Sequence, residues 1–335
     1  MNKEFFKKII LGFLFLSIAF NVSYWAIAKY DVYSDLTAVG DAASYIEMSK
    51  GNWDVPSPYR YRIVVPAIVS VLNQYFHPEV FLSQYYEGVD SKRIQLNFGL
   101  VNILLIALTA YIFYFYCKEL KFAEWECLVG VFLFFTSFFV VTYYPVPMVD
   151  AAGAFILMAA FYAILRKSAL WVGLILLVGL FTKESALIIP VIVFLSERTI
   201  LSARLLACIP GVCAYVFFRA MLPSAEGHSI FEILTNGALL QTSIQNGLNN
   251  LDLYTVIENV QTYMFLWVLF FVGLVKGLIP DFVRRQLILL LLPLIVPFAV
   301  HSSSVGRVAF YLFPLVIPVA LLVLRDVLKE NPDPQ

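Results

Sequence analysis

The residues best suited to chemistry in this 335-residue chain are isolated charges that interrupt or border long apolar stretches. Carboxylates can act as general bases towards hydroxyls or amines, and guanidinium or ammonium groups can hold phosphate oxygens. Charges within or beside apolar helices are energetically expensive and commonly mark functional sites in membrane proteins. The candidates, in chain order, are Asp35, Asp41, Tyr45, Arg60, Arg62, Asp150, Lys183, Glu184 and Arg307.

The first candidate base is Asp41, which opens a helical pattern over residues 40–48. A carboxylate at a helix start commonly caps the helix by accepting amide protons, and spacing alone favours this role. The functional alternative is a general base at the membrane surface that deprotonates an acceptor hydroxyl or amine. Asp31 and Asp35 lie near enough in the sequence to compete for that role.

Arg60 and Arg62 flank Tyr61, so in an extended chain both guanidinium groups would lie on one face. Two such groups suit a phosphate or diphosphate, because each can bind two oxygens at once. Equally, the two side chains could extend from a surface loop to lipid headgroups. The sequence leaves both roles open.

Three further candidates border apolar stretches later in the chain. Asp150 follows a Pro-Val-Pro-Met segment, at a position where an aspartate commonly caps a helix. Lys183 and Glu184 lie between two short apolar runs and require partners or water at membrane depth. They can pair with each other, or Lys183 can bind a lipid phosphate, which is the role we favour. Arg307 precedes another apolar stretch and admits the same two roles.

The composition predicts an all-α polytopic membrane protein. Apolar residues make up 61% of the chain and charged residues 14%, and the mean hydropathy is +0.83. A soluble domain of this size would carry polar faces on its helices. The formal net charge is zero and no basic run occurs, which argues against a nucleic-acid partner. The four cysteines and three histidines lack metal-ligand spacing, so the sequence predicts no metal site.

About ten membrane helices are expected, if short ones are allowed inside a bundle. We place them near residues 9–28, 94–117, 127–144, 149–165, 169–181, 185–195, 200–222, 262–279, 286–300 and 308–324. The positive-inside rule places the short basic loops and both termini in the cytoplasm, so the candidate residues share the opposite face. The first run is interpreted as a retained helix, with a cleavable signal peptide as the alternative.

The chain is expected to form one integral membrane domain over residues 1–335. Two long loops, 29–93 and 223–261, would lie outside, and residues 326–335 would form a cytoplasmic tail. The apolar piece 63–76 is too short to cross a bilayer and is predicted to be an interfacial or re-entrant helix. The short apolar runs around residues 182–185 are predicted to form a hairpin whose tip faces a wet cavity.

Four sequence segments resemble, in the same order, the motifs of GT-C-type integral membrane glycosyltransferases. The resemblance is to the aminoarabinose and protein mannosyl transferases, which use polyprenyl-phosphate sugars. The segments are Gly40-Asp41 with Tyr45 and the stretch 58–66, Val149-Asp150-Ala151, Gly179-Leu180-Phe181-Thr182-Lys183 leading to Pro190, and Gly306-Arg307 followed by Phe313-Pro314. Two departures are that Val308 replaces a tyrosine and that Asp41 lacks the adjacent glutamate of the mannosyl transferases. The second departure keeps Asp35 as an alternative base.

The resemblance implies a GT-C-like bundle with a helical first outer loop, in the inner membrane of a bacterium. It implies inverting transfer of a sugar from a polyprenyl-phosphate donor to a glycan, lipid or protein acceptor at the extracytoplasmic face. Asp41 would be the base and Asp150 the second acidic position. Donor phosphate would be held by Lys183, Arg307 and either Arg60 or Arg62, with support from Tyr45 and Glu184.

Several points stay open at this level. The resemblance implies no fixed cofactor, because some members of that family use a divalent metal and others do not. The sugar, the acceptor and the oligomeric state are not specified by the sequence. The alternative functions are a transporter or flippase for lipid-linked sugars and a polymerase of lipid-linked glycans. Transporters commonly contain internal repeats, and none is visible in this chain.

Overall fold

The computed structural model describes residues 3–29, 40–56, 58–78, 92–196, 201–221, 237–250, 253–292 and 306–330. Within these residues every regular element is a helix, as the composition predicts. Three helices are long and apolar enough to cross a membrane: α1 (Lys3–Lys29), α5 (Arg93–Glu119) and α11 (Leu201–Met221). At 1.5 Å per residue, the 27 residues of α5 extend over about 40 Å.

A fourth span is possible if two bent helices are counted together. α14 (Leu253–Tyr263) and α15 (Phe265–Lys276) meet at an angle of 81°, and Met264 between them has a positive φ of 49°. Shorter apolar helices complete the set: α3 (Val64–Tyr75), α8 (Asp150–Leu165), α9 (Ala169–Leu180) and α10 (Ile188–Ser196) with the 3-10 turn η4 (Glu184–Leu187) before it. Three or four long spans among the described residues are fewer than the ten expected.

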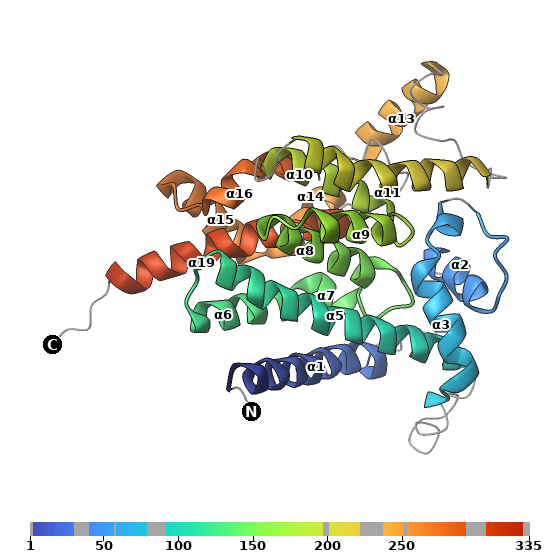
Figure 1. The fold of residues 1–335 in the computed structure, drawn as a ribbon, viewed down its shortest axis with the longest axis horizontal. Coiled ribbons are helices and arrows are strands. Elements are labelled where there is room, and N and C mark those ends of the chain that lie inside the picture. Colours follow the sequence, from blue (N-terminus) through green and yellow to red (C-terminus); the bar gives the residue numbers. More distant parts are fainter. Residues whose placement is uncertain are drawn as a thin grey trace.

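The helices stack side by side in the order α1, α5, α8, α9 and α11 (Figure 1). α8 is apolar all round, which is typical of a helix enclosed by others. All but two of its sixteen residues are buried. The chain reverses between α9 and α10, as the hairpin prediction requires, and Gly179 permits the close packing there. A Cβ atom at Gly179 would lie 2.6 Å from Ile156 of α8.

The carboxyl-terminal part forms a second side of the bundle. α15 packs on α19 (Phe313–Glu330), and α19 packs on α6 (Glu124–Phe135). The short helices α7 (Phe138–Thr142), α16 (Asp281–Arg285) and α18 (Gly306–Phe310) and the 3-10 turn η5 (Leu287–Leu291) connect the longer ones. α13 (Gly237–Asn250) projects from the bundle in Figure 1.

Ion pairs gather several helix ends at one end of the molecule, which we call the basic end. The pairs join the start of α1 to α6, the end of α5 to the end of α8, α6 to α19, and the end of α15 to α19. They are Lys7–Glu124, Glu119–Arg166, Glu126–Arg325 and Lys276–Asp326. α2 (Gly40–Ser49) and α3 lie at the opposite end in Figure 1.

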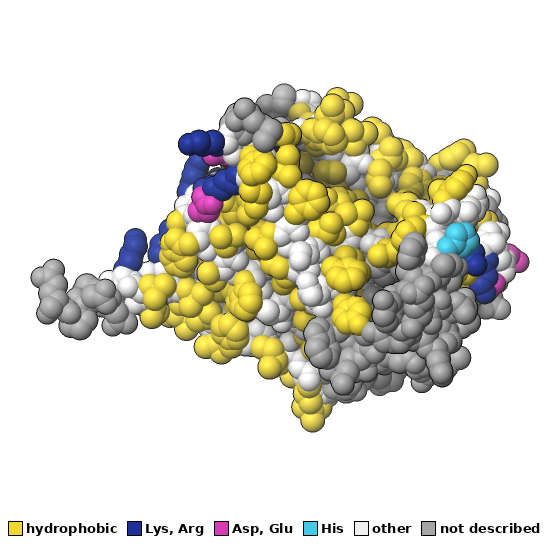
Figure 2. All heavy atoms as spheres, turned by 90° about the horizontal axis from the view of Figure 1, so that it is seen from below, with side chains coloured by type: hydrophobic (Ala, Val, Ile, Leu, Met, Phe, Trp, Pro, Cys, Tyr) yellow, Lys and Arg dark blue, Asp and Glu magenta, His cyan; other side chains and the backbone are white. Residues whose placement is uncertain are grey.

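Figure 2 shows apolar side chains over most of the face that carries α1, with charged side chains towards its two ends. Phe13 and Phe20 of α1 are among the exposed large apolar side chains. An apolar face between two charged ends is expected of a protein that lies in a bilayer. The surface and the long apolar helices are therefore compatible with a membrane protein.

Several expected helix boundaries were wrong. The run 127–144 is broken into α6 and α7, because Ser137 has an extended backbone and its hydroxyl bonds the carbonyl of Leu133. The run 308–324 is divided at residues 311–312 into α18 and α19. α19 also continues to Glu330, so residues 326–330 of the expected tail are helical. Residues 293–305, which include the end of the expected helix 286–300, lie outside the described part.

The expected loops contain helices. The loop 29–93 includes α2, the 3-10 turn η2 (Tyr59–Tyr61) and α3. α3 covers nearly all of the apolar piece 63–76 and packs on α5 and α2. The loop 223–261 contains α13 and most of α14. The helix expected at 262–279 is α15, which begins at Phe265 and ends at Lys276.

Candidate functional site

Six charged side chains from distant parts of the sequence meet at the end of the bundle that carries α2. They are supplied by the start of α2, the segment after η2, the start of α8, the tip between α9 and α10, and α18. The members of this ionic cluster are Asp41, Arg62, Asp150, Lys183, Glu184 and Arg307. The sequence had singled out all six, and the fold brings them together through a network of ion pairs and tyrosine hydroxyls.

Lys183 and Asp150 form the most deeply buried pair of the cluster. The Lys183 Nζ lies 2.5 Å from Asp150 Oδ1, and the Asp150 side chain is only 2% exposed. The Tyr311 hydroxyl donates to the same Oδ1 at 3.3 Å. A buried carboxylate must be paired or hydrogen-bonded because an uncompensated charge is very costly there. This pair therefore connects α8 to the tip of the α9–α10 hairpin.

The segment before Asp150 is fixed by a buried amide on α5. Asn102 is fully buried and donates from Nδ2 to the carbonyls of Val146 and Met148, at 2.7 and 3.2 Å. This segment has two prolines, and proline offers no amide hydrogen for a regular ladder. Asn102 thereby sets the position at which α8 begins and where its first carboxylate lies.

Arg62 forms the second tight contact of the cluster. Its Nε donates to Glu184 Oε2 at 2.8 Å, and its Nη1 donates to the Tyr45 hydroxyl at 2.5 Å. The backbone amide of Val64 also donates to the carbonyl of Phe181, at 3.2 Å. These contacts attach the segment 62–64 to the hairpin tip. The suggested mutual pair of Lys183 and Glu184 is therefore wrong, since each bonds a different partner.

The expectation that Arg60 and Arg62 share one face was also wrong. Residues 59–61 form the turn η2 instead of an extended chain, so the two side chains diverge. Arg60 lies 3.9 Å from Asp54, whose side chain is 89% exposed. An ion pair this long and this exposed contributes little to stability. Among the described residues, no ion pair or hydrogen bond joins Arg60 to the ionic cluster.

Asp41 is the most exposed carboxylate of the cluster, with 26% of its side chain accessible. Its Oδ1 accepts a hydrogen bond of 2.7 Å from the Tyr59 hydroxyl. Burial, together with this bond to a carboxylate, raises the pKa of Tyr59 to about 12. Tyr59 therefore stays protonated and keeps donating to Asp41 at neutral pH. The carboxylate lies in the first turn of α2, and its partners Tyr59 and Arg307 come from other parts of the chain.

Arg307 lies between the two aspartates at longer range. Its Nη1 is 3.6 Å from Asp41 Oδ2 and 3.8 Å from Asp150 Oδ2, and its guanidinium lies 5.2 Å from the centre of the Tyr143 ring. The preceding amide, of Gly306, donates to Glu258 Oε2 at 3.1 Å. The α18 backbone is thus held by α14 while the guanidinium faces α2 and α8.

The cluster is balanced in charge but uneven in how tightly its members are held. Three cations face three carboxylates. Lys183 and Arg62 are engaged at hydrogen-bonding distance, whereas both ion pairs of Arg307 exceed 3.5 Å. Guanidinium groups bind phosphate best with two parallel N–H donors. Arg307 and Asp41 are therefore the members best placed to bind a ligand without first breaking a buried pair.

Sequence reasoning missed several residues of this site. Tyr311 follows Arg307 by four residues, a helical spacing that puts both on one side, and this signal could have identified it. Glu258 was assigned to a loop, although an acid within an apolar amphipathic stretch was a usable signal. Asn102 is a polar residue inside an apolar helix, which was also a usable signal. Asp35, the alternative base, lies outside the described residues, as does Asp31.

No three His, Cys, Asp or Glu side chains gather in metal-binding geometry within the described part of the chain. Of the three histidines, His77 is exposed, and His228 and His301 lie outside that part. Cys117, Cys127 and Cys208 are buried, as expected of small core residues, but Cys213 is exposed.

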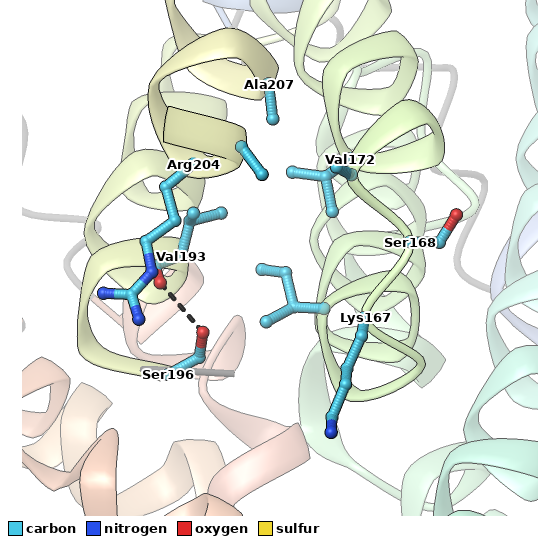
Figure 3. Close-up of a pocket in the computed structure, with 10 residues that line it drawn as sticks. Lys167, Ser168, Val172, Val193, Ser196, Arg204 and Ala207 are labelled. Atoms are coloured by element: carbon cyan, nitrogen blue, oxygen red, sulfur yellow. Dashed lines mark hydrogen bonds between the residues drawn. The ribbon is translucent and has the colours of Figure 1, made fainter. Parts of the chain in front are cut away.

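A separate small pocket lies at the other end of α8, about 24 Å away along the helix (Figure 3). Val172, Val193 and Ala207 point into it from three helices, with Lys167 and Arg204 at its edges. The Ser196 hydroxyl donates to the carbonyl of Val193 at 2.8 Å. This pocket shares no residue with the ionic cluster.

Comparison of the chain with protein-family models, with curated proteins and with solved structures found no match in any of the three.

Proposed function

We propose that the protein is a membrane glycosyltransferase that moves a sugar from a polyprenyl-phosphate donor to a hydroxyl or amine acceptor. The observation that carries this proposal is the juxtaposition of Asp41, partly exposed, with Arg307 at 3.6 Å. In an inverting displacement the base and the phosphate-binding cation act on opposite faces of the attacked carbon, so the donor sugar would enter between Asp41 and Arg307 and replace their direct contact. The motif resemblance to GT-C enzymes supports the same assignment.

In the proposed reaction, the acceptor attacks the anomeric carbon while Asp41 takes its proton. The new glycosidic bond forms as the bond from the anomeric carbon to the phosphate oxygen breaks, with inversion. The bonding pair leaves with the polyprenyl phosphate, which gains one negative charge. Arg307 stabilises that developing charge, and preorganised cations of this kind are commonly the largest electrostatic contribution to catalysis.

The tight pairs suggest positioning roles for their members. Lys183 holds Asp150, and Asp150 in turn lies 3.8 Å from Arg307 and helps to orient it. Arg62 joins Tyr45 to Glu184 and fixes the loop that carries Tyr59. Lys183 and Arg62, expected to bind phosphate directly, are therefore proposed to act mainly through the residues that they hold.

The proposal includes the finer membrane arrangement expected from the sequence. We propose a GT-C-like bundle of about ten apolar segments, with the shorter helices enclosed by α1, α5 and α11. Both termini would lie in the cytoplasm, with the ionic cluster opening on the other side and the segment 223–261 covering the donor or acceptor. A lid of that kind would exclude water from the reacting groups.

The test is a transfer assay with purified full-length protein in liposomes and a polyprenyl-phosphate sugar. Asp41→Asn keeps the shape but removes the base, and we expect transfer to fall by about 10²–10⁴-fold with donor binding retained. Glu47→Gln is the matched control, because Glu47 lies on the same helix and forms its ion pair with exposed Lys50. Undiminished transfer by Asp41→Asn would remove the proposed base.

The same liposomes separate an enzyme from a flippase. A flippase would move labelled polyprenyl-phosphate sugar across the bilayer without forming a new glycosidic bond. Translocation without product, in both the wild type and Asp41→Asn, would favour the transporter and contradict the proposed reaction.

A further inference from the structure

The basic end of the molecule contains an open groove of about 460 Å³ between the end of α5, the start of α6 and the last turns of α19. Its lining combines long cationic side chains with large apolar ones. The residues that matter here are Lys121, Phe122, Trp125, Arg325, Leu328 and Lys329. The groove lies at the opposite end of α5 from the ionic cluster and shares no residue with it.

The charge of the groove is positive. Three basic residues, Lys121, Arg325 and Lys329, face one acid, Glu126, which leaves a net charge of +2. Arg325 is already engaged, since its Nε and Nη2 donate to the two oxygens of Glu126 at 2.5 and 2.6 Å. Among the described residues, Lys121 and Lys329 form no ion pair within 4 Å. These two ammonium groups are the ones left to bind an anion.

The backbone at Lys121 is unusual for a lysine. Its φ is 69°, in the left-handed region, immediately after α5. The amides of Lys121 and Phe122 close the helix by bonding the carbonyls of Lys118 and Cys117. Glycine is favoured at such a position, because a Cβ atom crowds the backbone there. Lys118 already provides a cation for this helix end, so the helix itself does not explain the lysine at 121.

An exposed apolar stripe continues from the groove along α6. Trp125, Leu128 and Phe132 are 50%, 38% and 64% exposed, and spacings of three and seven place them on one helix face. The stripe extends over about 10 Å. A cationic groove joined to an apolar stripe matches the two ends of a lipid, a headgroup and an acyl chain. A free phosphate would use only the groove.

We propose that this groove binds an anionic phospholipid, with its phosphate between Lys121 and Lys329 and an acyl chain along Trp125, Leu128 and Phe132. Clustered lysines next to a membrane helix attract anionic headgroups. Trp125 adds an amphipathic ring at the depth where tryptophan concentrates in membrane proteins. The site is independent of the proposed transferase chemistry.

The chain provides a matched control at the end of α8. Lys167 has the same left-handed backbone, with a φ of 58°. The pocket beside it in Figure 3 has a volume of about 20 Å³, room for about one water molecule and too little for a phosphate. Lys167→Gly therefore makes the same backbone change as Lys121→Gly without altering the groove.

The experiment is native mass spectrometry of the full-length protein in a neutral detergent. Phosphatidylglycerol and phosphatidylcholine with identical acyl chains are titrated, and inorganic phosphate is added as a competitor. We expect phosphatidylglycerol to bind more tightly, and Lys121→Gly and Lys329→Gln to weaken it roughly fivefold each. Lys167→Gly is expected to bind as the wild type does. The melting temperature of Lys121→Gly should not fall, since glycine suits the backbone there.

Three outcomes would overturn the proposal. Equal affinities for the two lipids would show that the groove does not distinguish headgroups by their charge. A preference that survives in the Lys121→Gly/Lys329→Gln protein would place the lipid elsewhere. Displacement of the lipid by inorganic phosphate at a similar concentration would identify a free-anion site, in which the apolar stripe has no part.

Discussion

Arg307 is the cation of the ionic cluster that has the most hydrogen-bond donors available for a ligand. Its two carboxylate contacts, at 3.6 and 3.8 Å, leave its donors incompletely used, and its guanidinium faces the partly exposed Asp41. A lysine could supply the charge there but not the planar pair of donors. The shape of the guanidinium and its charge should therefore contribute separately to the reaction.

Substitutions of Arg307 test that separation. We expect Arg307→Ala to lower kcat by about 10²–10³-fold and Arg307→Lys to recover part of the loss. Arg60→Ala, which removes an arginine whose ion pair among the described residues is with exposed Asp54, should leave transfer near the wild-type rate. Steady-state kinetics with varied donor measure all three proteins. Equal losses for Arg60→Ala and Arg307→Ala would contradict the assignment of Arg307.

Gly153 provides a test of packing beside the same residues. A Cβ atom at this position would lie 2.7 Å from the Tyr311 hydroxyl and 3.3 Å from Lys183 Cδ. We expect Gly153→Ala to destabilise the protein by about 1–3 kcal/mol, and Tyr311→Phe to relieve part of that cost in the double variant. Thermal unfolding in detergent measures the change.

Gly12→Ala is the control for that substitution. Gly12 also lies in a helix, but its nearest neighbour would be Tyr111 at an ordinary 3.9 Å. Alanine is the better helix former by about 1 kcal/mol, so this variant should be at least as stable as the wild type. If both alanine variants raise the melting temperature, then Gly153 is not held at close contact.

At the scale of elements, a buried ion pair fixes how the α9–α10 hairpin meets α8. The contact depends on Lys183, at the tip of the hairpin, and on Asp150, at the first position of α8. Removing one partner leaves a buried charge without compensation, whereas replacing both removes the need for it. The arrangement of these elements should therefore respond differently to single and double substitutions.

A double-mutant cycle measures that difference. Lys183→Met and Asp150→Leu should each lower the free energy of unfolding by about 3–5 kcal/mol, and the double variant should be much closer to the wild type. Lys50→Met breaks an exposed pair with Glu47 and should cost less than about 1 kcal/mol. Strictly additive losses in the cycle would mean that the two side chains do not interact.

At the scale of the whole molecule, the face shown in Figure 2 is apolar between two ends that carry charged side chains. The basic end joins α1, α5, α6, α8, α15 and α19 through exposed or half-buried ion pairs. The ionic cluster lies at the far end of α8 from its carboxyl terminus. Short loops rich in lysine and arginine are retained on the cytoplasmic side of a membrane. We therefore predict that the basic end lies in the cytoplasm and the ionic cluster on the other side.

Single-cysteine labelling in intact cells tests the orientation. In a protein with its four native cysteines replaced, we expect Gly51→Cys, beside α2, to react with an impermeant maleimide added outside. Lys167→Cys, at the end of α8, should react only after the membrane is opened. Labelling of both positions from the same side would contradict the proposed topology and would place the cluster away from the donor.

The amino-acid types and their order already determined an all-helical, apolar chain and the residues that carry charge within it. They also predicted α5, α8, α9 and α11 to within a few residues, because long apolar runs bounded by basic residues are local signals. Only the tertiary structure decided which charges pair. Partner choice depends on side chains more than thirty residues apart, as with Asp150 and Lys183, and no local pattern encodes that distance.

The same reasoning explains which expectations were wrong. Arg60 and Arg62 diverge because a proline-initiated turn replaces the extended chain, and the helix 127–144 breaks where Ser137 adopts an extended backbone. The local conformational preferences at both positions differ by small free energies, and packing against the rest of the protein outweighs them. Asp150 and Lys183, by contrast, are buried charges, and leaving either one unpaired would strongly destabilise the protein. A fold that buries both must therefore pair them.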